Sequence, residues 1–191
     1  MGTLFGRNNF MEKYIIFEGS IDQQATLRLV NAIQNAINQA PQATKVTLIF
    51  SSLGGNIYDG FLLASFIQNS RVPIAIHAVN HIDSIANVVY LSAKERTAES
   101  HAKFYMHGAS TQGNFDEKAL KEQLSSIKTN NSRIAHFVSS NSGISLKKVR
   151  SMMESGTTVS TQEALKYKIV QKIAHKEVPS DAIREEIIYV N

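Results

Sequence analysis

The chain has 191 residues, which is enough for one well-cored domain, and its 43% hydrophobic and 19% charged fractions are those of a globular protein. It has no cysteine, which excludes a disulfide framework, a catalytic thiolate and a zinc–sulfur site. The formal charge of +4 comes from scattered Lys and Arg, a distribution that disfavours nucleic acid as a partner. No apolar run approaches the roughly 18 residues that cross a bilayer. We therefore expect a cytoplasmic protein with no secretory leader and no membrane contact, folded as a single domain over residues 1–191.

The first half of the chain alternates short strands with helices. Apolar, β-rich runs predict strands at Tyr14–Phe17, Lys45–Phe50, Pro73–Val79 and Lys103–Met106. Periodicity near 3.6 predicts helices from Asp22 to about Ala40, over Ile57–Gln68, and directly after Ser84. This alternation favours right-handed βαβ units and a mainly parallel sheet.

After His107 the pattern changes to that of one long helix. Asn114 and Glu117 have the spacing of a capping box, and Gly143 ends the run. A series at alternating spacings of four and three runs through Leu120, Leu124, Ile127, Asn131, Ile134 and Val138, and all of these except Asn131 are apolar. Such a narrow seam is typical of a helix that docks on another subunit, so we expect residues 114–142 to project from the domain.

Small and polar residues stand at the ends of three predicted strands. The sequence "SSLGG" follows one strand, "HIDS" the next and "HG" another. Carboxyl ends of parallel strands share one edge of a sheet, where ligands bind. A glycine pair there lets the backbone approach a substrate, a serine at a helix start lies beside unpaired N–H groups, and a histidine can take its proton. The residues thus indicate acyl transfer by Ser84 and His107. The alternative is a structural pair, with Ser84 as a helix N-cap.

The order of these segments resembles the ClpP peptidase family, within the ClpP/crotonase fold. The resemblance runs from about Ile15 to Ile173 and includes "SSLGG", the Ser84 helix, "FYMHGA" and "VSTQEALKYKIV". It implies an α/β fold of repeated ββα and βαβ units with a mainly parallel sheet and a projecting long helix. Residues 114–142 would be the handle-like helix, residues 1–12 a flexible N-terminal segment and residues 177–191 a C-terminal tail.

The resemblance also implies an activity and an assembly. The chain would be a serine endopeptidase that cleaves peptides or unfolded proteins, and it would form a homo-oligomer of stacked heptameric rings with an ATP-dependent unfoldase as partner. Ser84 would be the nucleophile and His107 the general base. The backbone N–H groups of Gly55 and Ile85 would form the oxyanion hole.

No cofactor and no metal is expected. His77 and His81 are four residues apart, but they lie on a strand and its following turn, and neither carboxylates nor cysteines complete a metal site.

The sequence departs from the family pattern at several positions. Gly156 stands where the family has the third member of the triad, an aspartate, and Glu154 is the nearest carboxylate along the chain. Leu53 replaces a proline of the glycine loop. Asp83 and Ala86, on either side of the serine, replace an alanine and a glycine.

Because Gly156 has no carboxylate, the sequence is compatible with more than one function. In serine proteases, loss of the triad aspartate lowers turnover on the order of 10⁴-fold. The chain is then either a slow peptidase or a catalytically impaired homologue that acts as a scaffold or a mixed-ring subunit. A crotonase-type acyl-coenzyme A enzyme is a third interpretation, which the pairing of Ser84 with His107 disfavours.

Overall fold

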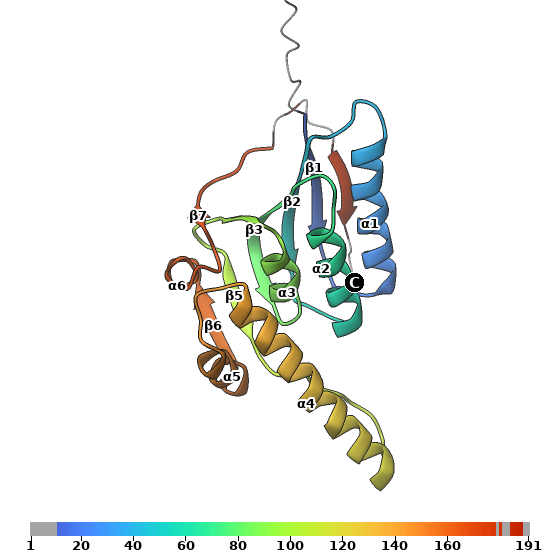
Figure 1. Ribbon diagram of the computed structural model, residues 1–191, viewed down its shortest axis with the longest axis vertical. Helices are drawn as coiled ribbons and strands as arrows, with labels where there is room; N and C mark the ends of the chain where they lie inside the picture. The colour runs from blue at the N-terminus through green and yellow to red at the C-terminus, as the bar shows by residue number, and fades with distance from the viewer. Residues whose placement is uncertain (1–10, 179, 181–183, 189–191) are drawn as a thin grey trace, which may run out of the picture.

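The computed structural model describes residues 11–178, 180 and 184–188 (Figure 1). Its strands are β1 (Glu12–Glu18), β2 (Lys45–Ser52), β3 (Ile74–Asp83), β4 (Glu95–Ala98), β5 (Lys103–Met106), β6 (Thr157–Ser160), β7 (Lys172–Ile173) and β8 (Arg184–Ile188). Its helices are α1 (Gln23–Asn38), α2 (Ile57–Gln68), α3 (Ala86–Ser92), α4 (Glu117–Ser140), α5 (Leu146–Ser155) and α6 (Thr161–Lys166).

Within the described residues the strands form one eight-stranded sheet. The main order is β6-β5-β3-β2-β1-β8, and β4 pairs with β3 and β7. All the pairings are parallel except that of β5 with β6. Helices α1, α2 and α3 lie together on one face of the central strands (Figure 1). The predicted α/β fold with a mainly parallel sheet is therefore confirmed.

Strand β3 and helix α3 are both embedded in the core. Residues Ile74–Ala78 of β3 are all buried, as expected for a central strand of a parallel sheet. All seven residues of α3 are buried too. The turn between these two elements holds Ser84, so the core fixes that turn on both sides.

Helix α4 has two different halves. Its C-terminal half packs on the domain through Ile134, Ala135 and Val138, which are buried. Its N-terminal half extends away from the sheet (Figure 1), with Leu120 58% and Leu124 50% exposed. The apolar seam predicted from the sequence is therefore only half used within one chain.

Several boundaries differ from the sequence-based predictions. Helix α4 begins after Asp116, whose carboxylate accepts the Ala119 N–H at 2.8 Å, so the predicted capping box at Asn114 is wrong. Strand β3 continues past Val79 to Asp83. The short strands β4 and β6 were not predicted.

Both ends of the chain show further differences. Strand β1 begins at Glu12, inside the segment 1–12 that was expected to be flexible, and residues 1–10 of that segment lie outside the described residues. Within the tail 177–191, strand β8 pairs in parallel with β1. In the part of the chain that the structure describes, none of the helices is both long and apolar enough to cross a bilayer.

Candidate active site

Ser84 lies in a sharp turn between β3 and α3. Its φ of 57° is in the left-handed region, which costs a residue with a Cβ roughly 1–2 kcal/mol. The N-cap position of α3 is taken by Ile85 and has no side-chain hydrogen bond. Ser84 Oγ is thus not used as a helix cap, which was the structural alternative for this serine. Backbone strain that the surrounding structure maintains is a mark of functional positions.

Hydrogen bonds tie the Ser84 turn to the end of β5. The Ser84 N–H donates to the Tyr105 carbonyl at 2.8 Å. Asn87, which is 1% exposed, donates from Nδ2 to the carbonyls of Ile82 (3.0 Å), Ser84 (3.2 Å) and Tyr105 (2.9 Å). Because Tyr105 is two residues before His107, this network brings the predicted nucleophile and the strand of the predicted base together.

The glycine loop lies directly against the serine. A Cβ at Gly54, where φ is 96°, would lie 2.6 Å from Ser84 Cβ and 2.9 Å from the Asp83 carbonyl oxygen. At Gly55, where φ is 146°, a Cβ would lie 2.2 Å from the Ile21 carbonyl oxygen. A side chain at either glycine would clash, on one side of the loop with the Ser84 turn and on the other with Ile21. Their backbone conformation also favours glycine.

The backbone of this loop leaves a donor free. Ile21 donates to the Gly54 carbonyl at 2.8 Å and accepts the Asn56 N–H at 2.7 Å, a parallel bridge that turns the N–H of Gly55 away from Ile21. The N–H groups of Gly55 and Ile85 make no hydrogen bond with any described residue. Both of the predicted oxyanion donors are thus unpaired.

His107 follows β5 and is half-buried. Its ring stacks on the ring of Tyr105, with centroids 5.1 Å apart and planes 21° apart. Neither ring nitrogen is hydrogen-bonded to a described residue, and no Ser84–His107 hydrogen bond is present. The backbone that follows is anchored by Gly108 N–H to the Met153 carbonyl (3.1 Å) and by Ala109 N–H to Asn131 Oδ1 (2.7 Å).

Gly156 ends helix α5 as a left-handed cap, with φ 62° and ψ 68°, and its N–H donates to the Met152 carbonyl. A Cβ at this position would lie 2.9 Å from the Tyr105 hydroxyl. The expected place of the triad carboxylate therefore adjoins the ring that stacks on His107, and it holds no side chain.

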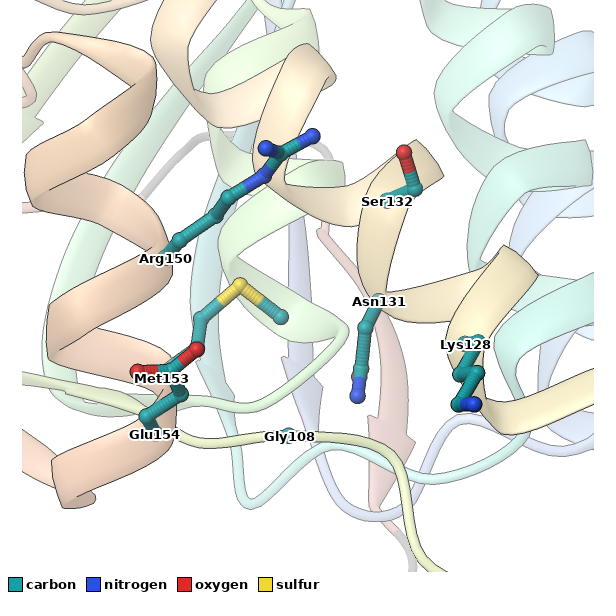
Figure 2. A pocket seen from close by; sticks show the side chains of 7 residues that line it. All are labelled: Gly108, Lys128, Asn131, Ser132, Arg150, Met153 and Glu154. Carbon is teal, nitrogen blue, oxygen red and sulfur yellow. The ribbon is translucent and has the colours of Figure 1, made fainter. Parts of the chain in front are cut away.

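Glu154 does not take over that role in this geometry. It lines a cavity of about 270 Å³ beside the segment after His107 (Figure 2). The cavity lies between α4 and α5, and its other lining residues are Gly108, Lys128, Asn131, Ser132, Arg150 and Met153. Glu154 is exposed on α5 and makes no hydrogen bond to His107.

Asp83 pairs with a different histidine. Its Oδ2 is 3.2 Å from His81 Nδ1, and its Oδ1 is buried without a hydrogen-bond partner among the described residues. His77 is fully buried, with its two ring nitrogens bonded to Thr97 and Glu99. Burial lowers the pKa of His77, although the Glu99 carboxylate opposes this. His77 and His81 thus have separate partners, and no group of three metal-ligating side chains occurs in the described part of the chain.

The chain belongs to the Clp protease family. A model of that family matches residues 6–177, most of the sequence, and this confirms the predicted ClpP-like resemblance. Among solved structures the chain is similar to a mutant ClpP1 from Listeria monocytogenes, with a TM-score of 0.75 and 16% sequence identity over 86% of this chain and 92% of that chain. At this identity the likeness shows the fold alone. No curated protein sequence matches the chain.

Sequence reasoning missed three residues that organise this region. Asn87 is a polar amide near the start of the apolar run "IANVVYLSA", and that contrast was the available signal. Asn131 interrupts the apolar seam of α4, and it binds the backbone after His107. Of the alternating residues Phe104 and Tyr105, one is expected in the core and the other along a wall, and nothing in a strand pattern indicates which ring a tyrosine stacks on.

Proposed function

We propose that this chain is a serine peptidase that hydrolyses peptide bonds through an acyl-enzyme on Ser84. The observation that carries the proposal is the strained Ser84 turn, which is held against β5 while the serine hydroxyl is left unused by the helix. Membership of the Clp protease family supports the same class of reaction.

Each candidate residue then has a defined role. His107 removes the proton of Ser84 as Oγ attacks the scissile carbonyl carbon, and the N–H groups of Gly55 and Ile85 donate to the developing oxyanion. The C–N bond breaks as His107 passes the proton to the leaving amine. A water, activated by His107, hydrolyses the ester and restores Ser84. Peptides or unfolded proteins are the proposed substrates.

The same geometry predicts a low rate. No carboxylate is hydrogen-bonded to His107 among the described residues, and Gly156 has no side chain to supply one. This also supports a second candidate function, a catalytically impaired homologue that serves as a scaffold or as a subunit of mixed rings.

We further propose that the chain is a homo-oligomer, with α4 as an interface between subunits. Leu120 and Leu124 lie on one side of the projecting half of α4, and about half of each side chain is exposed. Apolar side chains grouped in this way are typical of association surfaces. A ring that receives unfolded chains from an ATP-dependent partner would fit such an interface.

Covalent labelling tests the catalytic proposal. A fluorophosphonate probe should label the wild-type chain at Ser84, and Ser84→Ala should abolish both labelling and peptide hydrolysis, a loss of at least ~10³-fold. Ser100→Ala is the matched control, because Ser100 is exposed in the turn between β4 and β5. Hydrolysis that survives Ser84→Ala would refute the nucleophile. A folded chain with neither labelling nor hydrolysis would support the impaired homologue.

Sedimentation tests the assembly. Leu120→Asp together with Leu124→Asp should lower the oligomeric state, because each change buries a carboxylate in an apolar contact. Thr129→Asp introduces the same charge on the opposite, exposed side of α4 and should leave the state unchanged. A wild-type chain that sediments as a monomer at micromolar concentration would contradict the proposal.

A further inference from the structure

His107 is held by a contact that neither the sequence nor the proposed mechanism assigns. Its ring lies nearly parallel to that of Tyr105, at a centroid distance of 5.1 Å, and both residues are half-buried. Tyr105 and His107 are two apart at the end of β5, so the pleat places their side chains on the same face. The stack follows directly from this alternation.

The far end of the Tyr105 ring meets the α5 cap. The Tyr105 hydroxyl lies 2.9 Å from the point where a Cβ of residue 156 would stand, closer than non-bonded carbon and oxygen atoms approach. A side chain at position 156 and the present position of the tyrosine hydroxyl therefore exclude each other. Gly156 makes room for Tyr105, and its left-handed φ of 62° suits a residue without a Cβ.

The Tyr105 backbone is fixed as firmly as its ring. Its carbonyl accepts the Ser84 N–H at 2.8 Å and Asn87 Nδ2 at 2.9 Å. In the two ladders Tyr105 pairs with Asp83 of β3 and with Thr158 of β6. The ring that contacts His107 thus belongs to the residue that also anchors the Ser84 turn.

We infer that Tyr105 is the positioning residue of His107: its ring restrains the imidazole plane by stacking, at the place where Gly156 leaves no carboxylate to do so by hydrogen bonding. This inference rests on the proposed peptidase function. A parallel stack contacts the face of the imidazole and leaves both nitrogens free at its edge, one for the serine proton and one for water. It restrains orientation, and it does not select a tautomer as a carboxylate would.

Two substitutions distinguish the contribution of the Tyr105 ring to catalysis from that of its hydroxyl. Tyr105→Phe keeps the stack, so its kcat should stay within about threefold of wild type. Tyr105→Leu removes the stack, so kcat should fall at least tenfold with KM unchanged, and fluorophosphonate labelling of Ser84 should slow equally. Tyr167→Leu is the matched control: Tyr167 is a half-buried tyrosine at the C-cap of α6, and its substitution should leave kcat unchanged.

NMR gives a readout that does not depend on activity. The Cε1–H signal of His107, assigned with His107→Gln, should show an upfield ring-current shift in wild type and in Tyr105→Phe, and should lose it in Tyr105→Leu. If Tyr105→Leu does not fold, Tyr105→Met, which is longer, replaces it in both measurements.

Three outcomes would overturn the inference. The first is a Tyr105→Leu chain that loses the ring-current shift and keeps the wild-type kcat, because the stack would then exist without positioning the base. The second is an equal loss of kcat in Tyr105→Phe and Tyr105→Leu, which would assign the effect to the hydroxyl. The third is a wild-type chain without labelling or hydrolysis. That result overturns the proposed function and the positioning role with it, while the ring-current shift still reports whether the stack forms.

Discussion

The two sides of the candidate active site are built differently. On the nucleophile side, Ser84 is held by its own backbone N–H, by a hydrogen bond from Asn87 to its carbonyl and by the close approach of Gly54. Asn87 also donates to the carbonyls of Ile82 and Tyr105 on either side of the turn. On the base side, His107 has one ring contact, with Tyr105. Backbone groups and the buried Asn87 side chain position the nucleophile, whereas a single ring contact positions the base. Substitutions on the first side should therefore affect both folding and activity, and those on the second side mainly activity.

Among the substitutions on the nucleophile side, Asn87→Ala should cause the largest loss of stability and activity. It removes three hydrogen bonds from a buried site, so the free energy of unfolding should fall by about 3 kcal/mol. Hydrolysis should fall by more than ~10³-fold because the Ser84 turn relaxes. Chemical denaturation and peptide hydrolysis measure the two effects. Asn69→Ala is the control: Asn69 is exposed at the end of α2 and should change stability by less than about 0.5 kcal/mol.

Gly54→Ala tests the close approach of the loop to Ser84. The new Cβ would lie 2.6 Å from Ser84 Cβ on a backbone with φ of 96°. We expect a loss of about 1–3 kcal/mol in stability and a loss of labelling rate at Ser84, since the loop has to move away. Leu53→Ala, at the neighbouring exposed position of the same loop, should keep the stability of wild type. Equal stability of Gly54→Ala and wild type would show that the loop does not press on the serine.

On the base side, a substitution can also improve the positioning of His107. Gly156→Asp alone should be strained, because its Cβ meets the Tyr105 hydroxyl at 2.9 Å. Combined with Tyr105→Phe it gains room, and a carboxylate beside His107 should raise kcat tenfold or more, within the ~10⁴ range of that interaction. A double-mutant cycle in kcat and in melting temperature measures the coupling. Additive effects would mean that residues 105 and 156 do not compete for space.

His77 contrasts with His107, because hydrogen bonds hold both of its ring nitrogens. Burial lowers its pKa below the ordinary value of 6.5, so below that pH the unfolded chain takes up a proton that the folded chain does not. Stability should be complete above pH 6.5 and fall as the pH drops, by at most about 1.4 kcal/mol per pH unit. His77→Gln should flatten this slope in denaturation curves between pH 7 and 5, and His101→Gln, at an exposed position, should not.

The sequence predicted much of the fold because apolar periodicity is strong in the core. Helix α2 and strand β5 were predicted to the residue. Strand β3 was predicted too short because His81 and Asp83 make its last residues look like a turn, although they pair with β5. Strands β4 and β6 are four residues each, with several exposed polar side chains, and such strands carry no detectable pattern.

The candidate site was predictable only in part. Strand-end position was enough to select Ser84, His107 and the glycine pair. The left-handed backbone of Ser84, the reach of Asn87 across two strands and the contact of Tyr105 with both His107 and position 156 depend on tertiary packing. A single sequence contains no signal for such contacts.

The pairing of β8 with β1 has a consequence for biosynthesis. Strand β1 lies between β2, the next strand along the chain, and β8, which comes near the opposite end of the sequence. As the chain leaves the ribosome, β1 can pair with β2 early, but its other edge stays open until β8 has been synthesised. An unpaired edge is a template for pairing with other chains, and contacts between such distant segments slow folding. The nascent chain therefore exposes this edge of β1 to other chains from the synthesis of β1 until β8 pairs with it.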